Sequence, residues 1–459
     1  ALWWLSLVYG LYAISYGVLF ANLLIYSNQS PYINFSENHA FQFFGAFGTL
    51  TFVLPLLGGC ICDKFGFLFV AKFGLALSVV GFVALSLDTK FFFFIGVAIC
   101  LVGNALAMPA IWSMVGMIYK KTDSARESGA TIFYLLFNIG FLVAFSSGSL
   151  VAVYLGYATM FLIFGAGSLL ALCVLLVKGK SIHNLPEISQ GFMALFLISI
   201  LILVITSLLL SFLIVNNVLM WILTISAFIF LFYLSKRQNN EANSSSIKAF
   251  MFLCFLGIIG ITIYNSEFGI LPEFAHHAVN LGLGEFYLPG QIITSLDPLF
   301  CIVLGLLLGK VWILLGKFGK SPQLATKLTL GIILPALGYL VLVFAIQDNI
   351  NAKLSLLWLL PIFILFVTGE LLILPTGIAM AGRLAPNGKE GLFMGIWNVM
   401  QGFSSLITGY VAYFTVVKPE QSMIEVNMRY SQVFLYAGLV ILVIGVIGFL
   451  LRNKINRLI

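Results

Sequence analysis

The stretch FMALFLISILILVITSLLLSFLIV, residues 192–215, contains no charged side chain. A run of about 20 apolar residues is long enough to cross a bilayer as an α-helix. The run that follows it, LMWILTISAFIFLFYL at residues 219–234, has the same aliphatic and aromatic character. Neither run contains glycine, the residue that lets membrane helices approach most closely, so both are expected to face lipid.

The rest of the chain follows the same pattern. Of 459 residues, 61% are hydrophobic and 8% are charged, whereas soluble domains carry roughly 25% charged residues. The sequence therefore predicts an all-α polytopic membrane protein with fourteen transmembrane helices. We expect them near residues 2–26, 40–61, 66–87, 91–119, 129–153, 156–177, 191–214, 217–235, 248–270, 289–313, 325–346, 355–381, 391–417 and 430–451.

The basic residues indicate the topology. The net charge of +7 does not indicate nucleic-acid binding, because 19 of the 23 Lys and Arg residues fall at alternate ends of the expected helices. The opposite ends hold only Lys90, Lys353, Lys418 and Arg429. Cytoplasmic loops carry an excess of Lys and Arg. Both termini are therefore predicted to be cytoplasmic, which an even number of helices allows.

The two lipid-facing helices divide the chain. We expect an N-terminal six-helix bundle at residues 1–180, an inserted helix pair with its linkers at 181–247, and a C-terminal six-helix bundle at 248–459. Transporters built of two bundles move one bundle against the other around a central site. The loop GGCICDKFG, residues 58–66, resembles the gate signature of the major facilitator superfamily, with Gly59, Asp63 and Lys64 at its key positions. An ordinary turn between two helices is the alternative.

Three acids are expected inside the membrane, all of them in the second six-helix half: Glu370, Asp297 and Glu267. An intramembrane ion costs about 2.5–3.5 kcal/mol on insertion scales, so such residues are functional candidates. No Lys or Arg is expected at comparable depth. The alternatives are a neutral Glu370 bonded to a neighbouring helix and an Asp297 that shapes a helix break before Pro298.

No metal site, cofactor or catalytic residue is predicted. The six cysteines lie in or next to apolar runs and are expected to pack. His276 and His277 are interpreted as a solvated pair in an outward loop. The chain shows no Ser/His/Asp grouping and no His-Glu-x-x-His motif, which makes an intramembrane enzyme the weakest interpretation.

Several longer motifs resemble one family, the proton-dependent oligopeptide transporters (POT, also PTR) of the major facilitator superfamily. The segment at 103–140 resembles the family's signature across helices four and five, with FYLLFNIG at 133–140 in place of Phe-Tyr-x-x-Ile-Asn-x-Gly. SLDPLF at 295–300 is similar to Ser-Leu-Asn-Pro-Leu-Phe of the eighth core helix. GELLILPTGIAMAGRLAP at 369–386 and GLFMGIW at 391–397 are similar to core helices ten and eleven.

The departures from the family pattern remove charged side chains from one end of the expected binding site. The family's first helix carries Glu-x-x-Glu-Arg, and here Tyr9, Tyr12 and Ala13 stand at those charged positions, while Tyr16 keeps a pocket tyrosine. The family's lysine in helix four is replaced by Met108. Both cations that the resemblance assigns to a peptide carboxylate are therefore absent.

The amine-binding end is retained. The resemblance assigns Glu370 and Asn138 to the peptide's amino terminus and Trp397 to the pocket, and Asp297 replaces an asparagine there. A desolvated carboxylate needs a cation or several donors, whereas an ammonium group can meet carboxylates and aromatic faces. The predicted substrate is therefore a peptide or a peptide-like, amine-bearing small molecule without an obligatory free carboxylate.

The predicted mechanism is secondary active transport by alternating access, with symport of a proton through Glu370, Asp297 or Glu267. One alternative is a uniporter of a cationic or non-peptide metabolite driven by the membrane potential. The other is a membrane sensor that keeps the fold without transport. The predicted partners are the substrate, a proton and the lipid bilayer, and the protein is expected to be a monomer.

The first helix poses a separate question. Tyr9, Tyr12 and Tyr16 follow i, i+3, i+7 spacing, which places them on one helix face. They are predicted to form a neutral wall of the substrate cavity. The alternative is that this face only packs against a neighbouring helix.

Overall fold

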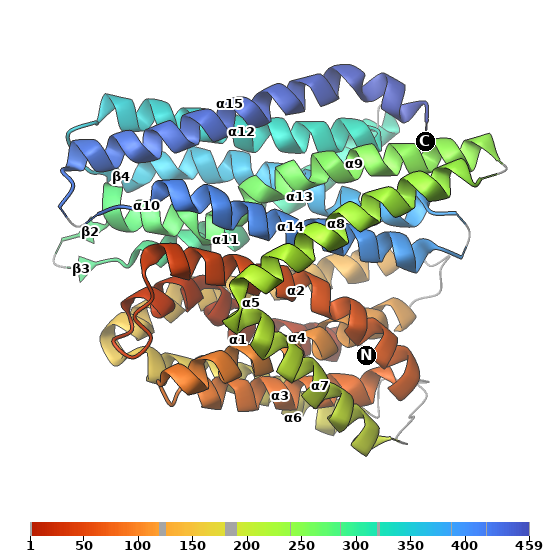
Figure 1. The fold of residues 1–459 in the computed structure, drawn as a ribbon, viewed down its shortest axis with the longest axis horizontal. Helices are drawn as coiled ribbons and strands as arrows, with labels where there is room; N and C mark the ends of the chain where they lie inside the picture. The colour runs from red at the N-terminus through yellow and green to blue at the C-terminus, as the bar shows by residue number, and fades with distance from the viewer. Residues whose placement is uncertain are drawn as a thin grey trace. The chain divides into compact units, whose positions relative to one another are not determined.

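A computed structural model of the chain describes residues 2–118, 125–179, 191–238, 240–284, 286–318, 322–386, 388–418 and 420–458. Helices dominate it (Figure 1). The chain divides into two compact units: unit 1 comprises Ala1–Asn216 and Gln291–Leu299, and unit 2 comprises Asn217–Gly290 and Phe300–Ile459.

Unit 1 is a helical bundle. Its helices are α1 (Leu2–Gln29), α2 (Glu37–Phe65), α3 (Phe67–Leu85), α4 (Lys90–Ile118), α5 (Ala125–Leu155), α6 (Tyr157–Lys178) and α7 (Phe192–Ser211). The 3₁₀ turn η3 (Gly290–Ser295) and the first residues of α11 (Leu296–Lys317) belong largely to it as well.

Small residues bring the helices of unit 1 together. A Cβ added at Gly140 of α5 would lie 2.3 Å from the carbonyl oxygen of Gly10 on α1, so only glycine fits this crossing. Gly66 (φ +88°) makes the sharp turn from α2 into α3 with a backbone angle that other residues rarely adopt. Close approach of this kind is how membrane helices gain packing energy without a hydrophobic force between them.

Unit 2 contains the remaining helices. They are α8 (Leu213–Lys236), which begins at the end of unit 1, α9 (Glu241–Asn265), α10 (Ile270–Ala278), α11 (Leu296–Lys317), α12 (Leu324–Asp348), α13 (Leu359–Leu384), α14 (Glu390–Ala412) and α15 (Met423–Asn456). Short 3₁₀ turns lie between them: η2 (Ser266–Phe268), η4 (Leu356–Trp358) and η5 (Tyr413–Thr415).

The strands are two residues long and lie in loops. β1 (Val279–Asn280) pairs in parallel with β4 (Leu354–Ser355), and β2 (Gly282–Leu283) pairs antiparallel with β3 (Phe286–Tyr287). They tie loops together, and Val279 of β1 and Leu354 of β4 are buried.

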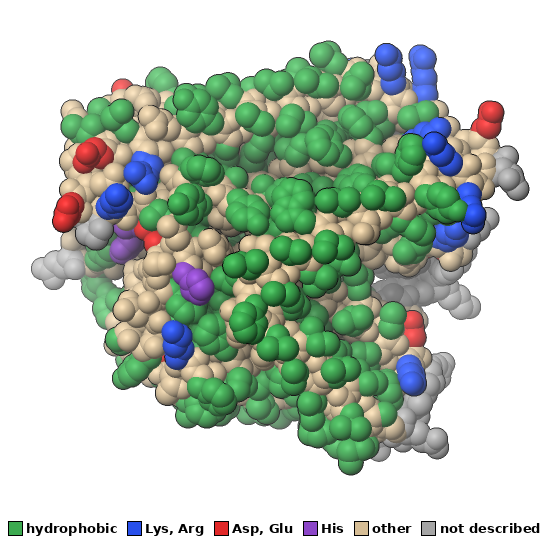
Figure 2. Space-filling view, in the orientation of Figure 1, with side chains coloured by type: hydrophobic (Ala, Val, Ile, Leu, Met, Phe, Trp, Pro, Cys, Tyr) green, Lys and Arg blue, Asp and Glu red, His purple; other side chains and the backbone are tan. Residues whose placement is uncertain are grey.

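The prediction of an all-α polytopic membrane fold is confirmed. Among the described residues, 13 helices are long and apolar enough to cross a membrane. The one predicted span outside these 13, at 391–417, corresponds to α14, whose 23 residues are long enough to cross a bilayer. Figure 2 shows mainly hydrophobic side chains on the flanks of the helices, with Lys and Arg gathered near helix ends.

The predicted domain division at 1–180, 181–247 and 248–459 keeps α7 and α8 together as one inserted pair. In the structure these two helices fall in different units. α7 falls in unit 1 and contacts α2 and α4, whereas nearly all of α8 falls in unit 2. An inserted pair that acts as a separate element stays a prediction. The linker residues 181–190 lie outside the described residues, as do Lys120, Lys121, Lys180 and Lys320 of the predicted basic ends.

Candidate functional site

The three tyrosines of α1 are buried in unit 1, and each hydroxyl has a partner on another helix. Tyr12 donates to Oδ1 of Asn104 on α4 at 2.7 Å. The hydroxyls of Tyr16 and Thr51 on α2 lie 2.7 Å apart. These contacts join α1 to two neighbouring helices.

Tyr9 is held by rings as well as by a hydrogen bond. Nε1 of Trp112 donates to its hydroxyl at 2.9 Å. Its ring stacks on Phe133 and Phe137 of α5, with centroids 4.4 and 4.5 Å away. The hydroxyls of Tyr9, Tyr12 and Tyr16 thus contact helices of the same bundle, which favours the packing interpretation. Their predicted contact with substrate stays a prediction.

Asn138 and the gate motif occupy separate places in unit 1. Nδ2 of Asn138 donates to the carbonyl of Tyr134 in its own helix at 3.0 Å. In the gate motif, Asp63 and Lys64 are exposed in the last turn of α2.

The close helix approach at the motif falls one residue before the predicted glycine. A Cβ at Gly58 would lie 1.7 Å from the carbonyl oxygen of Ala105, whereas one at Gly59 would meet nothing within 4 Å. The sequence pattern did not distinguish these two adjacent glycines.

Glu370 lies in the middle of α13 and is 4% exposed. The thiol of Cys301 on α11 donates to its Oε2, with sulfur and oxygen 3.3 Å apart. Thiols are weak donors, so this contact by itself holds the carboxyl group only weakly. Sequence reasoning had treated Cys301 as a packing residue.

Asp297 stands in the first turn of α11 and is buried. It precedes Cys301 by four residues, which places the two side chains on the same face of the helix. This i, i+4 relation was the signal in the sequence that could have connected Cys301 with the intramembrane acids.

Glu267 lies in η2, directly after α9 ends at Asn265. Its side chain is 0% exposed, and among the described residues neither of its carboxylate oxygens has a hydrogen-bond partner. The charge of Glu370 acts on it electrostatically. A buried polar group without a partner costs free energy, so the burial of Glu267 is unfavourable for the stability of unit 2.

Polar groups next to Glu267 are fixed by hydrogen bonds inside unit 2. The hydroxyl of Tyr339 donates to Oγ of Ser266 at 2.7 Å, and Nδ2 of Asn265 donates to Oγ of Ser405 at 3.1 Å. These bonds join α9 and η2 to α12 and α14. Sequence reasoning missed Tyr339 and Ser405, because nothing local marks a contact across more than 70 residues.

Trp397 is fully buried in unit 2. A Cβ added at Gly377 of α13 would lie 2.0 Å from its Cζ2 atom, and one at Gly257 of α9 would lie 2.4 Å from its Cζ3 atom. The indole therefore occupies the space that two glycines leave between α9, α13 and α14. This location favours a packing role, and its predicted contact with substrate stays a prediction.

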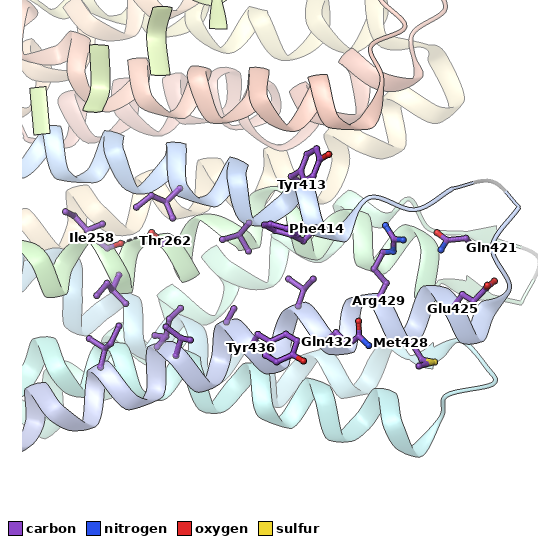
Figure 3. Close-up of a pocket in the computed structure, with 18 residues that line it drawn as sticks. Ile258, Thr262, Tyr413, Phe414, Gln421, Glu425, Met428, Arg429, Gln432 and Tyr436 are labelled. Atoms are coloured by element: carbon purple, nitrogen blue, oxygen red, sulfur yellow. Dashed lines mark hydrogen bonds between the residues drawn. The ribbon is translucent and has the colours of Figure 1, made fainter. Parts of the chain in front are cut away.

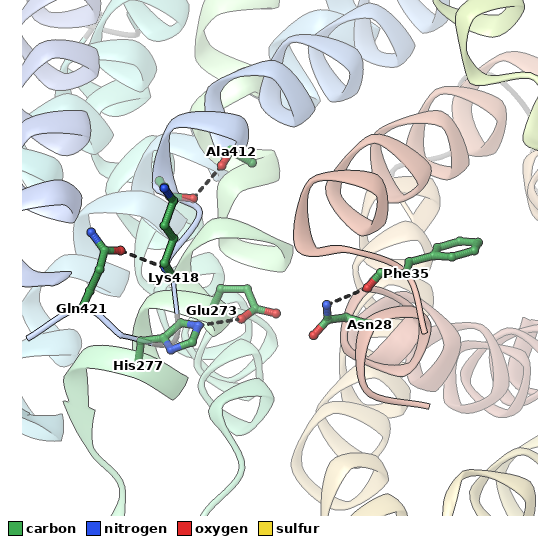
Figure 4. A network of polar contacts seen from close by, with 8 residues as sticks. Asn28, Phe35, Glu273, His277, Ala412, Lys418 and Gln421 are labelled. Carbon is green, nitrogen blue, oxygen red and sulfur yellow. Dashed lines mark hydrogen bonds and ion pairs between the residues drawn. The ribbon is translucent and has the colours of Figure 1, made fainter. Parts of the chain in front are cut away.

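His277 was predicted to be solvated, yet it is partly buried on α10. Its Nε2 lies 3.6 Å from Oε2 of Glu273 (Figure 4). Burial, with smaller effects from His276 and Lys353, lowers the pKa of His277 to about 4. At neutral pH the imidazole is uncharged, so this contact is not an ion pair.

Comparison with known proteins gives one consistent result. The model of the POT family matches residues 69–433. The chain is 28% identical over 441 residues to the uncharacterized transporter YclF of Bacillus subtilis, covering 93% of this chain and 87% of that one. It is 27% identical over 444 residues to dipeptide and tripeptide permease B of Salmonella typhimurium, covering 93% and 90%.

Solved structures agree in fold. A peptide transporter POT in complex with sulfate superimposes with a TM-score of 0.87 at 23% identity, covering 100% of this chain and 95% of that one. A POT family transporter in complex with 5-aminolevulinic acid gives 0.85 at 22% identity, covering 99% and 96%. At these identities the likeness concerns the fold, which is that of the major facilitator superfamily.

Proposed function

This chain belongs to the POT family, and we propose that it carries peptides or peptide-like, amine-bearing small molecules across the membrane by alternating access. The curated relatives include permeases named for dipeptides and tripeptides. One structurally similar transporter was crystallised with 5-aminolevulinic acid. Both support a small amine-bearing substrate for this chain. The protein is a membrane transporter and not an enzyme.

The observation that carries the proposal is the pair of buried acids in unit 2. Glu370 and Glu267 are 4% and 0% exposed and interact electrostatically. Two charged carboxylates in a desolvated place are unfavourable. Binding of an ammonium group or of a proton reduces this electrostatic cost. Glu370 and Glu267 therefore suit a site that binds the substrate's ammonium group and a proton in turn.

The substrate's carboxylate is not required. The positions that carry the family's helix-1 acids and arginine hold Tyr9, Tyr12 and Ala13, and Met108 replaces its lysine. Tyr9 and Tyr12 have their hydroxyls engaged with Trp112 and Asn104. A free carboxylate would find no cation at these positions, so amidated peptides and simple amines are proposed substrates as well.

Proton coupling is assigned to the same acids, with Asp297 as a third candidate. The loss of the helix-1 acids favours a second function, a uniporter of a cationic metabolite. The membrane potential contributes about 2.3 kcal/mol per charge per 100 mV, which is enough to concentrate a cation without a proton.

Cellular placement follows from the basic residues and the bacterial relatives. We assign the protein to the bacterial inner membrane with both termini in the cytoplasm, because Lys and Arg concentrate at one set of helix ends. It is proposed to act as a monomer, since each chain carries both bundles of the transporter fold.

Uptake into proteoliposomes tests the proposal. An inward proton gradient should drive accumulation of labelled dialanine and of dialanine amide, and unlabelled amide should compete for the same carrier. Strict dependence on a free C-terminal carboxylate would contradict the amine-centred site. Accumulation that follows the potential and ignores the pH gradient would favour the uniporter, and binding without flux would favour the sensor.

A further inference from the structure

A groove in unit 2 is lined by none of the three acids Glu267, Asp297 and Glu370. α9, α14, η5 and α15 line a hollow of about 970 Å³ (Figure 3). Its floor and walls are mainly aliphatic, and Tyr436 and Val440 at its edge are 68% and 58% exposed. Representative apolar lining residues are Ile258, Ile259, Val411, Ile441 and Ile444.

The apolar part of the groove has the depth of one lipid leaflet. Along α15 it runs from Val433 to Ile444, which at 1.5 Å per residue is about 16 Å. The hydrocarbon core of a bilayer is about 30 Å thick, so one leaflet contributes about 15 Å. An acyl chain that follows α15 fits this length.

One end of the groove is polar and carries both charges. Gln421, Glu425, Arg429 and Gln432 line it there (Figure 3). Nη1 of Arg429 donates to the carbonyl oxygen of Val416, which holds the guanidinium at the groove's end. A guanidinium has five N–H donors, so this one contact does not exhaust its capacity.

The carboxylate of Glu425 is held by Ser422. Its Oε2 accepts from the backbone N–H of Ser422 at 2.7 Å and from the hydroxyl of Ser422 at 2.9 Å, as part of a capping box. Glu425 and Arg429 are four residues apart and therefore neighbours on one helix face. Even so, the described residues contain no ion pair between them.

We propose that the groove binds phosphatidylethanolamine, a zwitterionic phospholipid with a primary ammonium group. One acyl chain lies along the apolar stretch of α15. The phosphate meets Arg429, and the ammonium group, two carbons away, meets Glu425. Glu425 and Arg429 carry opposite charges one helical turn apart, and each is fixed by its own partner. Together they complement a headgroup that carries both a negative and a positive charge.

The alternative phospholipids differ in defined ways. Phosphatidylcholine keeps both charges, but its quaternary ammonium has no N–H donor for a carboxylate. Phosphatidylglycerol has no cation, and its negative headgroup is repelled by Glu425. The order of preference therefore reports which headgroup chemistry the groove recognises.

Native mass spectrometry of the full-length chain in detergent tests the proposal. Palmitoyl-oleoyl phosphatidylethanolamine, phosphatidylcholine and phosphatidylglycerol are added in equal amounts, and retained lipid is counted. We expect the ethanolamine lipid to be retained about fivefold more than either other lipid, because an exposed charge contact contributes only modestly to binding. Equal retention of the three, or a preference for phosphatidylglycerol, would overturn the proposal.

Three variants assign the contacts. Glu425→Gln keeps the capping box, since glutamine serves in that motif, and should remove the preference for ethanolamine over choline while lipid still binds. Arg429→Gln should reduce retention of all three lipids. Glu420→Gln, in the adjoining loop and outside the groove lining, should change neither. A preference that survives Glu425→Gln would contradict the assigned headgroup contact.

Discussion

The hydroxyl of Tyr12 on α1 donates a 2.7 Å hydrogen bond to Oδ1 of Asn104 on α4. Both side chains are 2% exposed. This bond between two neutral side chains therefore joins two helices of the same bundle.

Tyr12→Phe should destabilise unit 1 by about 0.6–1.7 kcal/mol, the range for hydrogen bonds between membrane helices. The amide of Asn104 would then lie buried without this bond. Thermal unfolding in detergent measures the loss, and Tyr32→Phe, on an exposed side chain, is the matched control. If the tyrosine only packs, substrate affinity per folded molecule stays unchanged. A large loss of affinity with unchanged stability would instead support the cavity-wall prediction.

Glu370→Gln should abolish proton-driven accumulation and weaken amine binding by at least about thirtyfold, since removing one partner of a desolvated charge contact costs about 2–5 kcal/mol. Binding of dialanine amide by calorimetry and uptake in proteoliposomes measure the two effects. Glu390→Gln, at the exposed start of α14, should leave both intact. Unchanged pH-driven uptake in Glu370→Gln would remove this residue from the proton pathway.

Glu267→Gln should stabilise the fold while it impairs coupling. The substitution keeps the shape of the side chain and removes a buried acid whose oxygens have no hydrogen-bond partner among the described residues. A desolvated charge without a partner is unfavourable, so a neutral amide of similar shape should be better tolerated at this position. We expect a higher unfolding temperature, intact counterflow exchange and no proton-driven accumulation. A fall in stability would show that Glu267 is required for packing.

Gly58→Ala should destabilise the contact between α2 and α4 by about 1–3 kcal/mol through overpacking, because the new Cβ would clash with the carbonyl of Ala105. Gly59→Ala has open space and is the adjacent control. Thermal unfolding of the pair checks the prediction. Equal effects would show that helix propensity, and not the crossing, decides the outcome.

Because His277 is neutral in the folded chain, the stability of the fold should depend on pH. Its pKa is about 4 in the folded chain and about 6.5 in an unfolded one. The unfolded state therefore binds more protons between these values, and stability falls as pH decreases from about 6.5 towards 4. Because the side chain is 30% exposed, the loss attributable to it by pH 5 should be only about 1 kcal/mol.

His277→Gln should flatten that part of the stability profile between pH 7 and pH 5. Differential scanning calorimetry at several pH values measures it. His39→Gln provides a comparison at the start of α2. A profile unchanged by His277→Gln would show that other groups cause the acid sensitivity.

The sequence by itself determined the membrane fold, the number of long helices and the family. Apolar runs of about 20 residues have few ways to satisfy their backbone in lipid other than as helices, and motifs such as FYLLFNIG and SLDPLF are local. Sequence also located Glu370, Asp297 and Glu267, because an acid within an apolar run is conspicuous.

Only the tertiary structure decided which partners these residues meet. The bond from Cys301 to Glu370 joins residues 69 positions apart, and that from Tyr12 to Asn104 joins residues 92 apart. The choice between Gly58 and Gly59 likewise depends on which one faces α4. Such contacts depend on how each helix is rotated and crosses its neighbours, and small residues and side-chain packing across the bundle set that geometry.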